Sequence, residues 1–315
     1  MSKPRIVLFA PPESRQAPVA AAAMERAGAE PVVLSSRHGP EAPATVSMGA
    51  GRLAWDGVDF SGVHAIHVVA TAANTPFREP PVMSEAEHAG CRADFLREQL
   101  HQAALASFLE ACHHAGIPVA NRPGLPIIAH DAKGCLYDLL RGHGLTVPET
   151  LCTNDPAAAA DFAERHGEVV VKPFGGLGAA RVFPAGDKAA IESVRHCPVL
   201  LQRRVRGRTL RIHTVGDRIV LALDVLGFDR VDSRTSPKQF TPADLGAAHE
   251  EAVVRASRLL GMSYSAWDAI LADSGDLYLL DANPGPYLLW LGERWADLVL
   301  DALAAMLTTI RKASS

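Results

Sequence analysis

Asp268, Asp281 and Asn283 carry the side chains of this sequence that most directly indicate a site for chemistry. Two strand-like runs flank Ser274-Gly275, and so short a connection is typical of a β-hairpin. If the residues beside the turn pair with each other, Asp268 lies directly opposite Asp281. Asn283 follows two positions later and points to the same face as Asp281. The pattern predicts three oxygen-bearing side chains on one face of the hairpin.

Two carboxylates side by side repel each other unless a positive charge lies between them. Hard oxygen ligands suit Mg²⁺, which completes its coordination with water and nucleotide phosphates. The alternative is a solvent-exposed face, where acidic side chains need no partner. Apolar neighbours favour the metal: Ala266, Ile270, Leu279 and Leu280. We therefore expect magnesium at Asp268, Asp281 and Asn283.

A second segment of chemical interest is rich in glycine and has the sequence EVVVKPFGGLGAARVF. Lys172 ends a strand-like run, and Gly175, Gly176 and Gly178 follow before a second run begins. Glycines let backbone N–H groups approach phosphate oxygens, and a lysine adds a positive charge. No GK[ST] follows, and the loop leads into a strand, which excludes a Walker A loop and a Rossmann fingerprint. The segment predicts a flap over a nucleotide, with a glycine-rich hairpin that binds no ligand as the alternative.

The elements that position these residues begin with an open α/β layer. Three buried strands are expected, at 5–10, 31–34 and 65–70. An alanine-rich helix lies between the first two strands, and 35–63 reads as irregular. A long helix is expected from a cap at Ser84 to His114. NRPGLP, at 121–126, interrupts the pattern and is interpreted as a domain boundary.

Short strands and helices alternate in the remainder of the chain. A helix begins near residue 131, and strands are expected near 147–152, 169–173, 181–184, 199–203, 210–215 and 219–226. Asp155 begins a helix, since its TNDP context is a helix-start signal. Gly216-Asp217 is a hairpin turn signal between the last two of these strands. A helix over about 242–260, the two strands of the first hairpin and a terminal helix complete the expected elements.

Composition limits the function classes. The 315 residues are 48% hydrophobic and 21% charged, which predicts a globular chain of two or three domains. A net charge of −4 argues against a nucleic-acid partner that is bound through many phosphates. No apolar run is long enough for a membrane span, and the start does not match a secretory signal. Five cysteines without a CxxC pair favour reduced thiols, so we expect a cytoplasmic protein without membrane partners.

Four motifs, taken in order, resemble the ATP-grasp superfamily from about residue 120 to the end of the chain. They are DAKG (131–134), VVVKPFGGLG (169–178), LLQRRVRGRTLR (200–211) and WDAIL…YLLDANP (267–284). The resemblance implies a fold of α/β and α+β parts that clamps ATP between two α+β subdomains. The implied parts are an N-terminal open α/β domain (1–120), a small central lid (121–203) and a C-terminal α+β subdomain with the magnesium site (204–315).

The resemblance also implies which residues bind the nucleotide. They are Lys133, Lys172, Gly175, Gly176, Gly178, Gln202, Arg203, Val205 and Thr209. Lys133 and Lys172 match the pair that holds the phosphates, and the glycines match the flap. Gln202 matches the side chain that meets the adenine amino group, and Val205 the backbone that caps the ring. Thr209 stands where a ribose-binding acid is usual.

Catalytic roles follow from the same comparison. Arg211 matches the arginine that faces the γ-phosphate and the acyl-phosphate, and Lys172 shares in stabilising that charge. The magnesium ligands match Asp268, Asp281 and Asn283, in agreement with the hairpin. The sequence departs from the family pattern at Arg203 and Asp281, where glutamate is common, as well as at Thr209.

Shorter motifs indicate a sub-family. NRPG, VPETLCTNDP and NPGPYLLWLGE look most like enzymes of the graspetide or microviridin type, which close ester or amide rings in ribosomal peptides. Glutathione-synthetase-like ligases share the core. The resemblance implies an ADP-forming ligase that uses ATP and Mg²⁺ to join a carboxylate to an amine or hydroxyl, with a homo-oligomer expected by analogy. The alternatives are a ligase for free amino acids or a small natural-product intermediate, and a nucleotide-binding regulator without turnover.

Candidate substrate-binding residues come from a segment of mixed charge and from one histidine. Arg230, Arg234 and Lys238 lie in FDRVDSRTSPK and are candidates to hold acidic groups, although a solvated loop explains the segment equally well. His213 lies two residues from Arg211 and points to the same strand face, which makes it a further substrate candidate.

Overall fold

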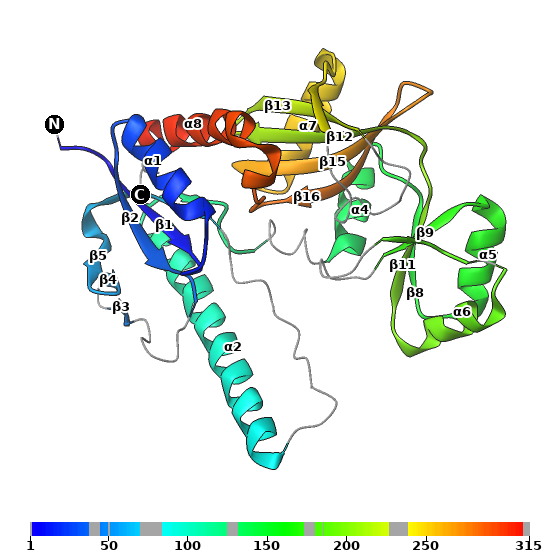
Figure 1. The fold of residues 1–315 in the computed structure, drawn as a ribbon, viewed down its shortest axis with the longest axis horizontal. Helices are drawn as coiled ribbons and strands as arrows, with labels where there is room; N and C mark the ends of the chain where they lie inside the picture. Colours follow the sequence, from blue (N-terminus) through cyan, green and yellow to red (C-terminus); the bar gives the residue numbers. More distant parts are fainter. Residues whose placement is uncertain are drawn as a thin grey trace. The chain divides into compact units, whose positions relative to one another are not determined.

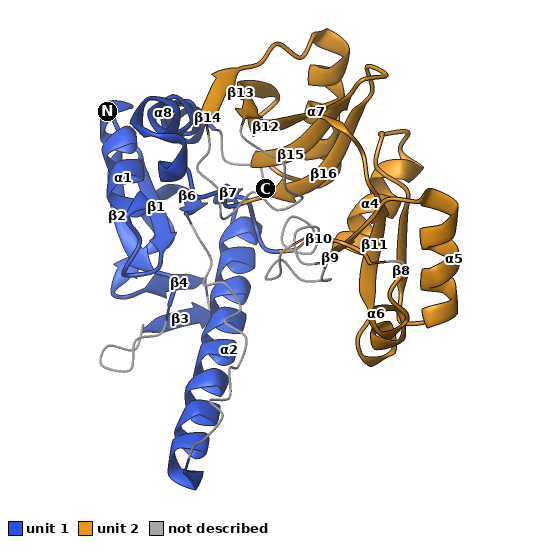
Figure 2. Ribbon diagram, turned by 45° about the vertical axis from the view of Figure 1, so that its right-hand side comes forward, with its two compact units in different colours: residues 1–123, 285–315 blue, residues 124–284 orange. Residues whose placement is uncertain are grey.

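The computed structural model describes residues 2–37, 45–49, 51–69, 84–124, 132–172, 180–184, 186–226 and 239–310. These residues form two compact units (Figure 2). One unit contains Met1–Pro123 together with Gly285–Ser315, and the other contains Gly124–Pro284. Each unit is described separately below.

A parallel sheet organises the first unit (Figure 1). Its strands, in the order β2-β1-β6-β7, are Glu30–Ser35, Arg5–Ala10, Val63–Val68 and Val119–Ala120. The helices α1 (Gln16–Arg26) and α8 (Glu293–Thr309) pack against each other, and α8 also contacts β6. The 3₁₀ turn η3 (Leu289–Leu291) precedes α8. The three expected strands of the layer are therefore present, and β7 extends the sheet.

The long helix α2 spans Glu85–His114, as the sequence predicts. Ser84 caps it: its hydroxyl accepts a hydrogen bond from the backbone N–H of Glu87, and the Glu87 carboxylate accepts one from the backbone N–H of Ser84. The C-terminal half of the helix packs Leu105 and Phe108 into the core below the sheet. The capping box thus sets where the helix begins, and burial of its later turns holds it in place.

The expectation of an irregular segment over 35–63 is wrong, because a small antiparallel sheet lies there. It contains β3 (Val46–Gly49), β4 (Arg52–Trp55) and β5 (Val58–Asp59), followed by the 3₁₀ turn η1 (Phe60–Gly62). The strands are too short for a clear period in the sequence. Trp55 holds the sheet to the core, since it is fully buried with its ring edge-on to Phe9 at a centroid distance of 5.4 Å.

A four-stranded antiparallel sheet forms the first part of the second unit. In the order β10-β9-β11-β8, its strands are Arg181–Val182, Val169–Lys172, Val199–Arg203 and Thr150–Thr153. The helices α5 (Pro156–His166) and α6 (Lys188–Ser193), with the 3₁₀ turn η2 (Val194–His196), accompany this sheet. Asp155 accepts a hydrogen bond from the Ala157 backbone and so caps α5, as expected.

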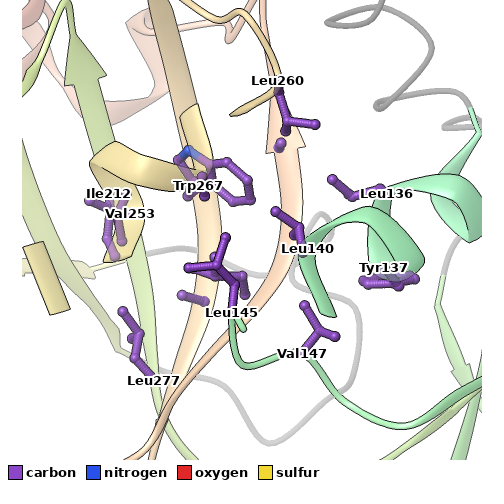
Figure 3. Packing of buried hydrophobic residues seen from close by; sticks show 14 of the residues in the cluster. Leu136, Tyr137, Leu140, Leu145, Val147, Ile212, Val253, Leu260, Trp267 and Leu277 are labelled. Atoms are coloured by element: carbon purple, nitrogen blue, oxygen red, sulfur yellow. The ribbon is translucent and has the colours of Figure 1, made fainter. Parts of the chain in front are cut away.

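A five-stranded antiparallel sheet forms the second part. In the order β14-β13-β12-β15-β16, its strands are Gln239–Pro242, Arg218–Leu226, Gly207–Val215, Tyr264–Ala272 and Leu277–Asn283. The helices α4 (Lys133–Gly142) and α7 (Ala247–Leu259) pack on one face of it. Figure 3 shows Leu140 of α4 and Trp267 of β15 in this core, to which Leu136 also belongs. The helix expected from residue 242 begins later, because β14 occupies the segment before it.

The two compact units do not have the same bounds as the three domains expected from the sequence. The first break falls between Pro123 and Gly124, within the expected NRPGLP boundary. The residues from Gly285 onward, which the sequence interpretation places with the C-terminal subdomain, form part of the first compact unit, and the expected ATP-grasp subdomains stay a prediction. Their helix α8 packs on α1, and Arg26 forms ion pairs with Asp297 and Asp301. Hydrophobic periodicity identifies a helix but does not indicate which sheet it covers.

Candidate active site

Asp268 and Asp281 lie directly opposite each other on β15 and β16, as the sequence predicts. Ala266 pairs with Asn283 two residues further along the two strands. Because side chains alternate between the faces of a sheet, both acidic residues and Asn283 share one face. The opposite face carries Trp267 and packs in the apolar core.

The turn that sets this register differs from the expected one. The hydrogen bonds of Ala272 with Asp276 and Gly275 enclose a three-residue turn rather than a two-residue turn. The register then shifts by one between Asp268 and Ala269, so that the pairing passes over Leu280 as a β-bulge. The two deviations cancel. The expected pairing of Asp268 with Asp281 is therefore present, although it arises from a longer turn followed by a bulge.

Arg211 adds a positive charge to this face from the neighbouring strand β12. It pairs with Asp268 in the ladder, and its Nη1 donates to Asp268 Oδ1 at 2.8 Å. The Arg211 side chain is 7% exposed, whereas that of Asp268 is 48% exposed. Arg211, Asp268 and Asp281 thus form one row across three adjacent strands, with the guanidinium buried and the central carboxylate accessible.

Lys133 and Tyr137 reach β16 from the helix α4. Lys133 begins the helix, and its Nζ lies 2.6 Å from Asp281 Oδ2. One turn later, the Tyr137 hydroxyl donates to the Leu280 carbonyl oxygen at 2.6 Å. Burial and the nearby Asp281 charge raise the pKa of Tyr137 above its usual value, so the phenol stays protonated. The bulged residue and the acid beside it are therefore both held by α4.

Lys172 occupies the end of β9 on the other side of Tyr137. Its Nζ donates to Gln202 Oε1 at 2.8 Å and lies 3.5 Å from the Tyr137 hydroxyl. The Gln202 amide nitrogen in turn donates to Thr150 Oγ1 at 3.1 Å. Burial lowers the pKa of Lys172, and the charges of Asp281 and Asp268 oppose that shift. Both predicted phosphate-binding lysines thus lie in electrostatic reach of the carboxylate pair.

The residues expected around the adenine and ribose lie at the end of β11, at the start of β12 and between these two strands. Arg203 Nη2 donates to the Tyr278 hydroxyl at 3.3 Å, and its guanidinium lies 5.7 Å from the centre of the Tyr278 ring. Thr209 pairs with Ile270, which pairs with Tyr278. Val205 lies between β11 and β12 in the sequence and is partly buried. Arg203 is therefore held by an aromatic side chain that sequence reasoning did not identify.

His213 lies on the same face as Arg211 and is fully buried. Within the described part of the chain, neither ring nitrogen has a hydrogen-bond partner. Burial, with the nearby Arg211 charge, lowers the pKa of His213 well below 6.5, so the imidazole is neutral. The other predicted substrate residues, Arg230, Arg234 and Lys238, lie outside the described residues, as do Gly175, Gly176 and Gly178 of the predicted flap.

The donor set suits magnesium. Two carboxylates and an amide oxygen are hard ligands, and they leave coordination positions for water and phosphate. Over the described ranges, no group of three or more His, Cys, Asp and Glu side chains is arranged to hold a metal. Asp268, Asp281 and Asn283 fit a metal whose remaining coordination is completed by water and phosphate.

Solved structures provide the comparison that decides the fold. The complex of the ATP-grasp ligase PsnB with a minimal precursor matches 97% of this chain and 99% of its own, with a TM-score of 0.81 and 24% identity. The macrocyclase MdnC of Microcystis aeruginosa MRC, bound with the precursor peptide MdnA, matches 97% of this chain and 100% of its own, with a TM-score of 0.77 and 17% identity. The chain has the ATP-grasp fold.

A third ATP-grasp structure and one curated relative extend the comparison. The RiPP-associated ATP-grasp ligase of Chryseobacterium gregarium, in complex with ADP and a leader and core peptide, covers 99% of both chains with a TM-score of 0.75 and 15% identity. Human N-acetylaspartylglutamate synthase A is 28% identical over 182 residues, which are 53% of this chain and 46% of the relative. The chain thus spans about half the length of the curated relatives it matches. No family model matches it.

Two residues that contact the candidate site of this ATP-grasp fold, Tyr137 and Thr150, were not predicted from the sequence, and they differ in whether the sequence could have indicated them. Tyr137 follows Lys133 by four residues, a spacing that places both on one helix face and was available in the sequence. Thr150 has no comparable signal, because its contact with Gln202 arises from strand pairing between β8 and β11. No helix among the described residues has the length and apolar character needed to cross a bilayer.

Proposed function

We propose that this protein is an ATP- and magnesium-dependent ligase that activates a carboxylate as an acyl-phosphate and joins it to an amine or hydroxyl on a ribosomally made peptide. The observation that carries the proposal is the row of Arg211, Asp268 and Asp281, flanked by Lys133 and Lys172. It combines metal ligands with cations within one surface, which is the arrangement that phosphoryl transfer requires.

Each basic residue has a defined task in this chemistry. Lys133 and Lys172 hold nucleotide phosphate oxygens, and Arg211 stabilises the negative charge that develops when the phosphoryl group moves to the carboxylate. Asp268, Asp281 and Asn283 would hold magnesium, which would supply positive charge to the phosphate oxygens during transfer. Gln202, Arg203, Val205 and Thr209 contact the adenosine part. Gly175, Gly176 and Gly178, which match the glycine-rich flap of the family in sequence, are assigned to phosphate binding.

The peptide substrate is supported by the solved structures, whose complexes contain precursor or leader and core peptides. In this proposal, His213 contacts the peptide, and Arg230, Arg234 and Lys238 bind its acidic side chains. The enzyme acts in the cytoplasm, where its scattered cysteines stay reduced. A homo-oligomer is consistent with this proposal and is tested by light scattering of the purified chain.

A second candidate is a ligase for free amino acids or another small molecule. The similarity to N-acetylaspartylglutamate synthase favours it, since the name of that relative states a small product. A third candidate is a nucleotide-binding regulator without turnover, which Arg203 and Thr209 favour because they depart from the family pattern at the nucleotide.

The test is to separate nucleotide products after incubation with ATP and Mg²⁺, in the presence of either acidic peptides or free amino acids. ADP formed only with peptides supports the proposal, and ADP formed only with amino acids supports the second candidate. AMP would show adenylation and overturn the acyl-phosphate route. Asp268→Ala and Asn283→Ala should abolish ADP formation. ATP binding without product from either pool would favour the regulator.

A further inference from the structure

Both carboxylates of the candidate metal site are already engaged by cations of the chain. Lys133 Nζ lies 2.6 Å from Asp281 Oδ2, and Arg211 Nη1 lies 2.8 Å from Asp268 Oδ1. The Lys133–Asp281 pair is the more enclosed, with side chains 11% and 23% exposed, against 48% for Asp268. Water screens an enclosed pair less, so Lys133 competes strongly with any other cation for Asp281.

The balance of charge around the site also disfavours a metal that arrives alone. Lys133, Lys172 and Arg211 carry three positive charges, and Asp268 and Asp281 carry two negative charges, within the described surroundings. A divalent cation therefore enters a site that is already positive. A triphosphate or diphosphate reverses this balance, because its oxygens attract the lysines and bring negative charge of their own.

The position of Lys133 favours its transfer from Asp281 to a phosphate. It is the first residue of α4, whose first turn contains no acidic residue, so the helix N-terminus favours a phosphate anion next to the Lys133 amine. Tyr137 fixes the same helix to Leu280, so that the Lys133 side chain can move while the backbone stays in place. Lysine has a long flexible stem with a single point charge, which suits such a movement.

We propose that Lys133 makes the metal site selective for a metal–nucleotide pair: it occupies Asp281 in the free protein and releases this carboxylate only when a nucleotide phosphate takes its place. This inference rests on the proposed function. It assigns Lys133 a role beyond phosphate binding, because the same side chain then determines whether a free divalent cation can bind.

The test measures Mn²⁺ binding to the full-length chain by electron paramagnetic resonance, with and without ADP. The wild-type chain should bind Mn²⁺ tightly with ADP and weakly without it. Lys133→Met should bind Mn²⁺ without ADP at least about tenfold more tightly than the wild type, because Asp281 is released. Loss of fold cannot create a new binding event, so this gain distinguishes the proposed role from a structural one.

Three controls complete the test. Lys133→Arg keeps the charge and should behave like the wild type. Lys133→Met with Asp281→Asn should lose the gained binding. Arg141→Gln, on the same helix but paired with the exposed Asp138, should leave Mn²⁺ binding unchanged.

Two outcomes separate this inference from the proposed function. If wild type and Lys133→Met bind Mn²⁺ alone equally well, and both bind it with ADP, the role of Lys133 is overturned while the metal site stands. If neither binds Mn²⁺ even with ADP, the metal assignment is overturned, and the inference with it.

Discussion

The hydroxyl group of Tyr137 donates a hydrogen bond to the backbone carbonyl oxygen of Leu280, with 2.6 Å between the two oxygens. Leu280 is the residue that the register shift passes over, and Asp281 follows it directly. A bulge leaves a backbone group outside the regular ladder, and a buried carbonyl group needs a partner. Tyr137 supplies that partner and thereby stabilises the backbone that aims Asp281.

Tyr137→Phe should therefore weaken both the fold and the metal site. We expect the free energy of unfolding to fall by about 0.5–1.5 kcal/mol, because a partly buried carbonyl group loses its donor. We expect the Kd of Mn²⁺ in the presence of ADP to rise by about 10-fold or more, as for other supports of a metal ligand. Urea unfolding and metal titration check these values. Tyr287→Phe changes an exposed tyrosine and should have neither effect; an unchanged Kd in Tyr137→Phe would contradict the role.

Arg211→Gln should separate catalysis from nucleotide binding. We expect kcat for ADP formation to fall about 100- to 1,000-fold, the usual loss when one donor to a developing negative charge is removed. The Kd of ADP should change little, since Lys133 and Lys172 remain. Arg208→Gln is the matched control, because Arg208 lies on the same strand and pairs with Asp224 at the surface. Steady-state kinetics with the identified substrate decide the point, and a kcat within about threefold of the wild type would exclude a role for Arg211 in the chemical step.

Gly207→Ala should destabilise the start of β12. Gly207 has a φ of +151°, and a Cβ there would lie 2.2 Å from the Leu271 carbonyl oxygen. We expect a loss of at least about 2 kcal/mol in the free energy of unfolding, because the strands must separate or the backbone must rearrange. Gly142→Ala provides the contrast. Gly142 lies in α4, and a Cβ added there would meet open space, so this substitution should stabilise the chain by about 0.5–1 kcal/mol. Equal stability of Gly207→Ala and the wild type in urea would refute the prediction.

His67 should make the stability depend on acid. Burial lowers its pKa from 6.5 to about 4, while a hydrogen bond with the Ala120 backbone opposes the shift. In the unfolded chain the imidazole takes up a proton below pH 6.5, whereas in the folded chain it stays neutral until about pH 4. The stabilising contribution is therefore complete above pH 6.5 and is lost as the pH falls to 4, with a total of about 3 kcal/mol.

His67→Leu removes this titration and should flatten the decline between pH 6.5 and 4. Urea unfolding at several pH values measures the slope. His114→Gln, at the exposed end of α2, should retain the slope of the wild type. An identical pH dependence for His67→Leu and the wild type would rule out His67 as a source of acid sensitivity.

Local signals account for the elements that the sequence predicts well. Ser84 with Glu87, and Asp155 with Ala157, satisfy helix N–H groups through residues close in sequence, so their patterns are readable. The turn at Gly216-Asp217 is also local, and Val215 pairs with Arg218 across it as expected.

Features that depend on distant residues could not be read in the same way. The small sheet around Trp55 is stabilised by packing on Phe9, whose place in the core is known only from the fold. The ion pair of Lys133 with Asp281 joins residues 148 positions apart. The resemblance to ATP-grasp proteins assigns both residues to one site, but it gives no indication that they bind each other.

The bulge at Leu280 has a consequence for changes in chain length. The three-residue turn and the bulge each move β16 by one position, in opposite directions, so Asp281 faces the site when both occur or when neither does. If Leu280 joined the regular ladder while the turn kept three residues, Asp281 would pair with Trp267 and turn to the core side. Turn length and bulge must therefore change together, so parity, rather than the length of the turn, is what this hairpin must preserve.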